Sequence, residues 1–487
     1  MVITADRGEL STVFAFSGNC CYPTRPNPAT GDGAFDGEGK DKRSIRPSGN
    51  GLAYDSCPRL RGERGTSSVK RANNINPAIL LWARQTAGLE LKEAADRLGF
   101  INPTDAQSPA ERLLAFERGE RMPTRNQLLK IAAVYRRPIL AFYMKQPPEK
   151  GDRGEDFRQT AGSVSRRENS LLDALLRDIR ARQQMVKSLL EDEDEHRALP
   201  YVGSAGIDQR AEVVAASIAA TLQFDHQRRD ARRGGADALF KTLRGRAESA
   251  GVFVLLVGDL GSHHTALGVE VFRGFAISDR TAPFVVINDQ DARSARSFTL
   301  IHELAHIWLD QSGVSGAPSP DTPRSLQDRI ERFCNDVAGE FLLPSDALGT
   351  MPEWPDAGNK QSAADFIRTL ADDWSISEPM VAYRLNRTGH VDTAIYRELM
   401  ADYTARWQRL RKRQRERYRD SEGGPNPHVV KRSKLGNALL DVVRRTMRDN
   451  TLTHTKAAKL LGVKPGSVES LLRGYEQHRG SMIQGAE

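Results

Sequence analysis

Apolar residues recur at helical spacing in the first part of the chain that shows a regular pattern, residues 75–148. Their spacing predicts four short helices, and a glycine stands where each of the first three should end. These helices should cover residues 77–87, 91–98, 108–118 and 127–135. Residues 149–245 continue as a mainly helical region, in which the apolar stripe from Leu171 to Ile179 is typical of core packing.

The periodicity changes near Gly251, where short continuous apolar runs replace the helical spacing. Such runs are typical of buried strands, and two longer amphipathic segments follow them. The predicted strands cover residues 252–257, 269–278 and 284–288, and the two predicted helices cover 297–310 and 326–342. Residues 246–393 should therefore form an α+β unit with a small sheet and a helix pair.

The remainder of the chain is charged and helical at its C-terminal side and irregular at its N-terminal side. A single helix is expected over residues 394–419, with a strongly basic end, and residues 394–428 then form a basic helix and linker. Three more helices, over 435–447, 455–461 and 467–473, give residues 429–475 a helix-turn-helix cadence. Residues 1–74 are rich in Gly, Pro, Asn, Ser and Arg, and are expected to be a disordered extension.

Composition narrows the class of protein. The 487 residues contain no apolar run approaching the roughly 20 that a membrane helix needs, and no secretory signal can be recognised at Met1–Gly18. A cytoplasmic protein without a membrane partner is expected. Four cysteines without a C-x-x-C pair argue against a disulfide framework or a cysteine zinc site. The net charge of +8 tilts only weakly toward nucleic acid, because a basic balance also keeps proteins soluble.

The chemistry of the chain centres on His302, Glu303 and His306 in the predicted helix 297–310. Residues i and i+4 lie on one face of a helix, so both imidazoles can bind one metal ion. Glu303 is placed to take a proton from water as it attacks a peptide carbonyl. A chance match is the alternative, and a structural zinc site is another, but that would require four protein ligands, mostly thiolates.

The following helix supplies candidates for a third ligand. Glu331 is preferred, because Glu340 lies nine residues on, about half a turn away around the helix. Cys334 lies near the same face as Glu331 and is a competing ligand, although a buried small residue is the simpler interpretation.

These segments, together with Phe284–Asn288 and Phe341–Pro344, resemble the ImmA/IrrE family of metallopeptidases, over roughly residues 156–389. The resemblance implies a zincin-like core, with zinc, or alternatively Mn²⁺, held by His302, His306 and Glu331, and with Glu303 as the base. Members of the family are bacterial or phage peptidases that inactivate a partner repressor by cleaving it. The residue that stabilises the oxyanion stays open among His263, His264, Tyr383 and His390.

Residues 76–143 resemble the Xre-type helix-turn-helix domain of phage repressors, through Leu91–Gly99 and Glu117–Thr124. In that resemblance the helix over 108–117 would contact DNA, which makes Ser108 and Arg112 the candidate nucleic-acid contacts. A protein-interaction or dimerisation module is the alternative, and a homodimer is one oligomeric state left open. The C-terminal segment could likewise contact DNA or serve as a packing domain.

Two functions are therefore weighed. The first is a zinc-dependent regulatory endopeptidase that cleaves a specific partner protein, a helix-turn-helix repressor or an antitoxin, while the N-terminal domain docks on DNA or on that partner. The second is a DNA-binding transcription regulator, or a toxin–antitoxin component, whose metallopeptidase domain acts as a sensor or binding module. The complete motif with Glu303 favours the first.

Overall fold

The computed structural model describes residues 74–100, 107–148, 165–192, 197–225, 234–315, 325–351, 359–420 and 426–475, with isolated positions 323, 354 and 356. The expected disordered extension lies outside the described residues except for Asn74, and so do Cys20, Cys21 and Cys57.

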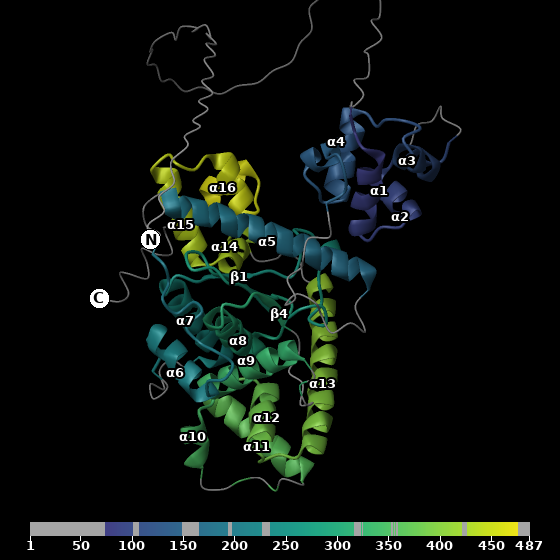
Figure 1. Ribbon diagram of the computed structural model, residues 1–487. Helices are drawn as coiled ribbons and strands as arrows, with labels where there is room; N and C mark the ends of the chain where they lie inside the picture. The colour runs from purple at the N-terminus through teal and green to yellow at the C-terminus, as the bar shows by residue number, and fades with distance from the viewer. Residues whose placement is uncertain are drawn as a thin grey trace, which may run out of the picture. The chain divides into compact units, whose positions relative to one another are not determined.

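The N-terminal part is a small helical unit with a hydrophobic core of its own (Figure 1). Ser108 and Thr124 each accept a hydrogen bond from a backbone N–H three residues on and form capping boxes, which fixes where two of the helices begin. Gly99 ends another in the left-handed conformation. The helices are α1 (Pro77–Thr86), α2 (Leu91–Leu98), α3 (Pro109–Glu117), α4 (Arg125–Val134) and the short η1 (Ile139–Tyr143).

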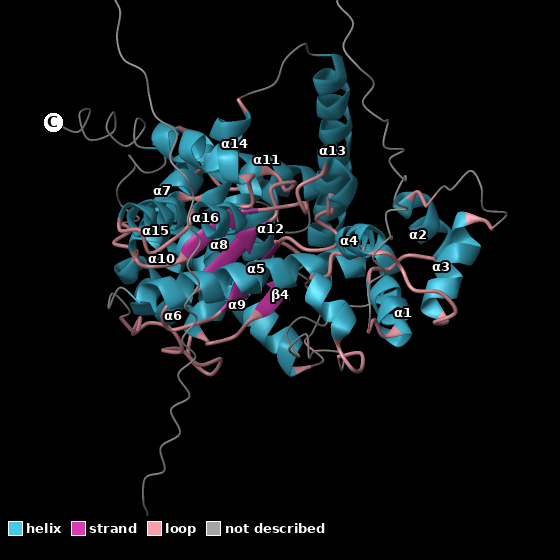
Figure 2. Ribbon diagram, turned by 90° about the horizontal axis from the view of Figure 1, so that it is seen from above, coloured by secondary structure: helices cyan, strands magenta, loops and turns pink. Residues whose placement is uncertain are grey.

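A four-stranded sheet lies at the centre of the rest of the described chain, in the order β1-β3-β2-β4 (Figure 2). Strands β1 and β3 are parallel, while β2 is antiparallel to both β3 and β4. The strands are β1 (Phe253–Leu256), β2 (Gly274–Ile277), β3 (Phe284–Ile287) and β4 (Gly313–Ser315). The expectation of an α+β fold with a small sheet is confirmed.

Helices cover both faces of this sheet, and each face belongs to a different hydrophobic core. Val254, Val285 and Ile287 point into the first core, which contains the predicted metal-site helix. Helices α6 (Ala211–Thr221), α7 (Gly235–Ser249), α8 (Arg296–Trp308) and α9 (Leu326–Leu342) contribute to it. Phe253 and Val286 point into the second core, on the opposite face.

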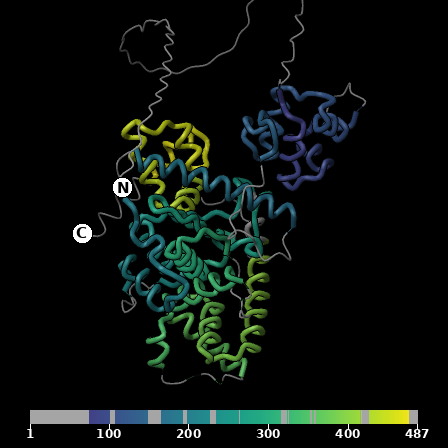
Figure 3. Tube along the Cα trace, viewed as in Figure 1, coloured from purple at the N-terminus to yellow at the C-terminus, as the bar shows by residue number. Residues whose placement is uncertain are grey.

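The second core joins segments that are far apart in the sequence. Helix α5 (Arg166–Asp192) runs beside the C-terminal helices, as the chain trace shows (Figure 3). The C-terminal helices are α14 (Pro427–Leu435), α15 (Asn437–Arg448), α16 (His454–Leu461) and residues 468–475, with the short η6 (Pro465–Ser467). Because their apolar side chains cover the sheet, these helices are part of the same folded body as the sheet.

Two predicted elements differ from those observed. The strand expected over residues 269–278 begins only at Gly274, because the Asn288 side chain donates hydrogen bonds to the carbonyl oxygens of Leu267 and Phe272 and holds that segment in a turn. The helix expected over 435–447 begins only at Asn437, because Gly436 adopts φ 79° and ψ 162° and separates it from α14, a helix that was not predicted.

The part of the chain after α9 is entirely helical where it is described. It contains α10 (Ser345–Gly349), α11 (Lys360–Trp374), α12 (Glu378–Arg387) and the long α13 (Thr393–Asp420). No helix among the described residues is long and apolar enough to span a membrane.

Candidate metal centre

The two histidines of the motif lie on α8, one turn apart and facing the same side. Leu300, Ile301, Leu304, Ala305 and Trp308 bury the neighbouring face of this helix in the first core. His302 is 3% exposed and His306 is fully buried, so both imidazoles are held at the edge of that core.

Three donor groups converge at this point. The Nε2 atoms of His302 and His306 lie 3.1 Å apart. The two carboxylate oxygens of Glu331, on α9, lie 3.3 Å from these nitrogens, one oxygen on each. Ligands placed about 2.0–2.1 Å from zinc at tetrahedral angles would be separated by roughly 3.3–3.4 Å. The spacing and the two-His, one-carboxylate donor set therefore fit a zinc ion, and the three residues can hold a metal.

The competing candidates on α9 lie elsewhere. Glu340 is buried, forms an ion pair with Arg384, and accepts hydrogen bonds from the backbone N–H and Oγ of Ser345, at 2.8 Å each. It therefore fixes the start of α10. Cys334 is fully buried beside His306, but it is not among the three residues whose donor atoms converge.

Burial and mutual electrostatic interaction shift the pKa values of the three donor groups. Burial alone would raise the pKa of Glu331, but the adjacent His306 and His302 hold it well below its usual range. Burial lowers the pKa of His302. The Nδ1 atoms of both histidines are buried and have no hydrogen-bond partner. An ionised carboxylate thus faces the two imidazoles. Although burial opposes it, the neighbouring Cys334 and Glu331 raise the pKa of His306 well above its usual range, so a metal ion binding here would displace a proton from His306.

Glu303 lies one position after the first ligand and is fully buried. Burial raises its pKa to about 8, with His306 opposing the shift. Among the described residues, neither carboxylate oxygen has a partner within hydrogen-bond geometry, although the nearby Ser315 hydroxyl lowers the pKa. The carboxylate fits beside the start of β2 only because residue 274 is a glycine, since a β-carbon there would lie 2.5 Å from Oε1 of Glu303. Sequence reasoning missed this role of Gly274.

Two further polar residues of α9 flank the ligand carboxylate. Gln327 precedes Glu331 by one turn, and its Nε2 donates to Oε1 of Glu331 at 3.4 Å. Asn335 follows Glu331 by one turn, is 6% exposed, and interacts with His302. The face predicted for Glu331 and Asn335 is therefore the face that meets α8.

The candidates for an oxyanion donor lie in different surroundings. The hydroxyl of Tyr383 donates to Oδ1 of Asp336 at 2.8 Å, so its proton is already engaged. His390 stacks on Trp354 with ring centroids 3.4 Å apart, and His264 is exposed. The side chain of His263 lies outside the described residues.

The two predicted nucleic-acid contacts are placed differently from each other. Ser108 is exposed but serves as the N-cap of α3. Arg112 is 4% exposed and donates through Nη1 to the carbonyl oxygen of Phe100, so it lies in the interior of the helical unit. The side chain of Arg112 is therefore buried and is not exposed for the predicted contact with DNA.

Comparison with known protein families gives a match to a segment that contains the candidate metal ligands. The Peptidase_M78 family model, described as the IrrE N-terminal-like domain, matches residues 263–386. This segment runs from the turn before β2 to α12 and contains both predicted metal-binding helices, so it supports the resemblance to the ImmA/IrrE metallopeptidases. Neither a curated protein nor a solved structure matches the chain.

Proposed function

We propose that the protein is a zinc-dependent endopeptidase in which His302, His306 and Glu331 hold the metal and Glu303 is the general base. The convergence of the two imidazoles and the Glu331 carboxylate, all within 3.3 Å of one another, carries this proposal. The match of residues 263–386 to a peptidase family agrees with it.

The residues divide the work of peptide hydrolysis in a simple way. A bound zinc ion supplies Lewis-acid chemistry, polarising a carbonyl and lowering the pKa of water. Glu303 takes the proton from the attacking water and delivers it to the departing amine. The surrounding core excludes bulk water and strengthens these interactions.

The substrate is proposed to be a folded partner with an extended cleavable segment, of the repressor or antitoxin class. Among the described strands β4 pairs only with β2, so its other edge presents backbone groups to which an extended segment can add. Ser315 of this strand is buried near Glu303. The separately cored N-terminal helical unit supplies a docking element for DNA or for the partner.

The substrate class can be tested with the product of the neighbouring gene. If that gene encodes a helix-turn-helix protein, we expect its intact mass to fall to two fragments when it is incubated with the zinc-loaded chain. Glu303→Gln, loaded with the same amount of zinc, should leave it intact. Cleavage by both proteins would remove Glu303 from the role of base, and an intact partner with both would remove this partner class.

A further inference from the structure

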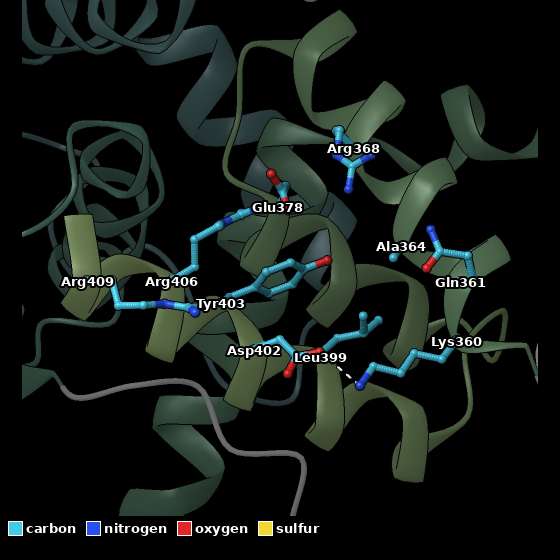
Figure 4. Close-up of a pocket in the computed structure, with 10 residues that line it drawn as sticks. All are labelled: Lys360, Gln361, Ala364, Arg368, Glu378, Leu399, Asp402, Tyr403, Arg406 and Arg409. Carbon is cyan, nitrogen blue, oxygen red and sulfur yellow. Dashed lines mark ion pairs between the residues drawn. The ribbon is translucent and has the colours of Figure 1, made fainter.

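A cleft lies between α11, α12 and α13, in a part of the chain distinct from the metal ligands (Figure 4). Its volume is about 410 Å³. Side chains from all three helices line it, and none of them takes part in the metal centre. The cleft has no role in the proposed hydrolysis.

The lining is rich in cations. Lys360, Arg368, Arg406 and Arg409 provide four positive charges, and Glu378 and Asp402 provide two negative ones. Two carboxylates beside the lining offset the difference, because Glu398 pairs with Lys360 at 3.3 Å and Asp365 pairs with Arg368 at 3.0 Å.

Most of these charges are held in place by partners. Arg406 pairs with Glu378 at 2.7 Å, and its guanidinium lies 5.2 Å above the ring of Tyr403. The Nζ atom of Lys360 lies 2.9 Å from Asp402. These pairs orient the side chains toward the cleft, although Lys360, Asp402 and Arg406 are largely exposed and their pairs contribute little energy.

Tyr403 gives the cleft a hydrogen-bonding group that the protein does not use. The residue is 8% exposed, and its hydroxyl is buried without a hydrogen-bond partner in the part of the chain that the structure describes. Figure 4 shows this oxygen directed into the space between Arg368, Glu378 and Ala364. Since a buried unpaired hydroxyl is costly, an acceptor brought into the cleft would relieve that cost.

Arg409 extends the cleft along α13. Among the described residues no carboxylate lies within ion-pair distance of its guanidinium, whose Nε donates only to the carbonyl oxygen of Ala405. The same residue also lines a second hollow, shared with Gln408 and Lys412. A free cation thus stands where the two hollows meet.

We propose that the α11–α13 cleft binds a phosphate group. Guanidinium groups match the oxygens of phosphate, and several cations with a hydroxyl around one space offer more donors than a two-oxygen carboxylate accepts. A phosphate monoester carries about −1.5 to −2 charges at pH 7, and Arg409, which has no carboxylate partner among the described residues, is the cation that it would pair with first. The phosphate belongs either to a small molecule or to a nucleic-acid backbone.

The binding test uses the full chain and inorganic phosphate. We expect phosphate to raise the Tm of the native protein relative to chloride at equal ionic strength, because a ligand that binds only the folded state stabilises it. Arg409→Gln should abolish most of this rise. Tyr403→Phe should reduce it without loss of basal stability, because the hydroxyl has no partner to lose. Arg413→Gln, an exposed residue of the same helix outside the cleft, is the charge-matched control.

A labelled 20-base-pair duplex distinguishes the two sources of phosphate. If the cleft takes a nucleic-acid phosphate, Arg409→Gln weakens duplex binding more than Arg413→Gln does, and phosphate competes. If it takes a small molecule, the two variants bind the duplex equally while only Arg409→Gln loses the phosphate effect. A native Tm that phosphate does not raise above chloride overturns the proposal, and so does a rise that persists in both Arg409→Gln and Tyr403→Phe.

Discussion

The side chain of Glu303 packs directly against the backbone of Gly274, in the space that a β-carbon at position 274 would occupy. A β-carbon on Gly274 would lie 2.5 Å from Oε1 of Glu303 and 2.7 Å from Cγ2 of Thr299. The first residue of the inner strand β2 is thus in contact with the candidate base, Glu303. The three atoms nearest to that β-carbon belong to Glu303 and Thr299, not to the metal ligands.

Gly274→Ala is therefore expected to displace the Glu303 carboxylate and leave the metal in place. A small displacement of a catalytic group can lower kcat by on the order of 100-fold. The measurement is zinc content together with the rate of substrate cleavage. Gly245→Ala, on α7 where a β-carbon meets nothing within 4 Å, is the control and should retain both. Full activity in Gly274→Ala would show that Glu303 does not depend on this contact.

The ligand assignment predicts different behaviour for two glutamates of α9. Loss of a residue that only hydrogen-bonds to a metal ligand lowers metal affinity by roughly 10–100-fold. Glu331→Gln removes a ligand itself and should lower zinc affinity by more than that. His302→Ala should likewise lose most of the metal. Glu340→Gln should keep the zinc but lose about 3 kcal/mol of stability, because it leaves Arg384 buried without its ion pair. Zinc analysis and urea unfolding separate these outcomes, and the reverse pattern would move the ligand to Glu340.

Much of the site could be predicted because it depends on local spacing. The i,i+4 placement of His302 and His306 and their apolar stripe specify a buried helix face, and α9 was predicted with its observed bounds, Leu326–Leu342. The third donor required an argument about helix faces, which the structure matches by bringing Glu331 to the histidines.

What could not be predicted depends on contacts between distant segments. Strand β4 has three residues, and its pairing with β2 is the feature that makes it a strand. Arg112 was predicted to be exposed because it is charged. In the structure it is buried, and the carbonyl oxygen of Phe100 accepts a hydrogen bond from its guanidinium. The role of Gly274 follows from an element 29 positions away, which no local pattern encodes.

The C-terminal helices should contribute directly to the stability of the peptidase core. Leu440 is 1% exposed in the core that covers the sheet, so Leu440→Ala should cost about 2–5 kcal/mol. In Leu440→Ala, zinc release and unfolding should both occur at a lower urea concentration than in the native chain. Val429→Ala, at an exposed position of α14, should change little. A Leu440→Ala protein that keeps its zinc to the same urea concentration as the native chain would show that the segment unfolds independently.

Lys431 of α14 predicts a dependence of stability on pH. Burial, together with the positive charges of Arg182 and Lys434, lowers its pKa to about 8. An unfolded lysine titrates near 10.4, so between pH 8 and about 10.4 the unfolded chain binds more protons and stability rises with pH. Below pH 8 the Lys431 ammonium is charged in both the folded and the unfolded chain, and the free-energy cost of burying that charge then destabilises the folded protein fully.

Lys431→Met should accordingly raise stability at pH 7 by on the order of 1 kcal/mol, after allowance for partial exposure. The gain should shrink as the pH rises from 8 toward 10. Urea unfolding at several pH values measures it, with the exposed Lys459→Met of α16 as the control. A loss of stability at pH 7 would mean that the ammonium makes a favourable contact in the folded state.

The central claim, that this chain cuts proteins with a metal held by His302, His306 and Glu331, is tested most directly by mapping new N-termini. A soluble extract of the source organism is incubated with the native chain or with Glu303→Gln, both loaded to one zinc per chain. We predict a small set of new N-termini with the native chain, absent with Glu303→Gln and absent when zinc is removed by a chelator. The same N-termini in both zinc-loaded samples, or none in either, would contradict the claim.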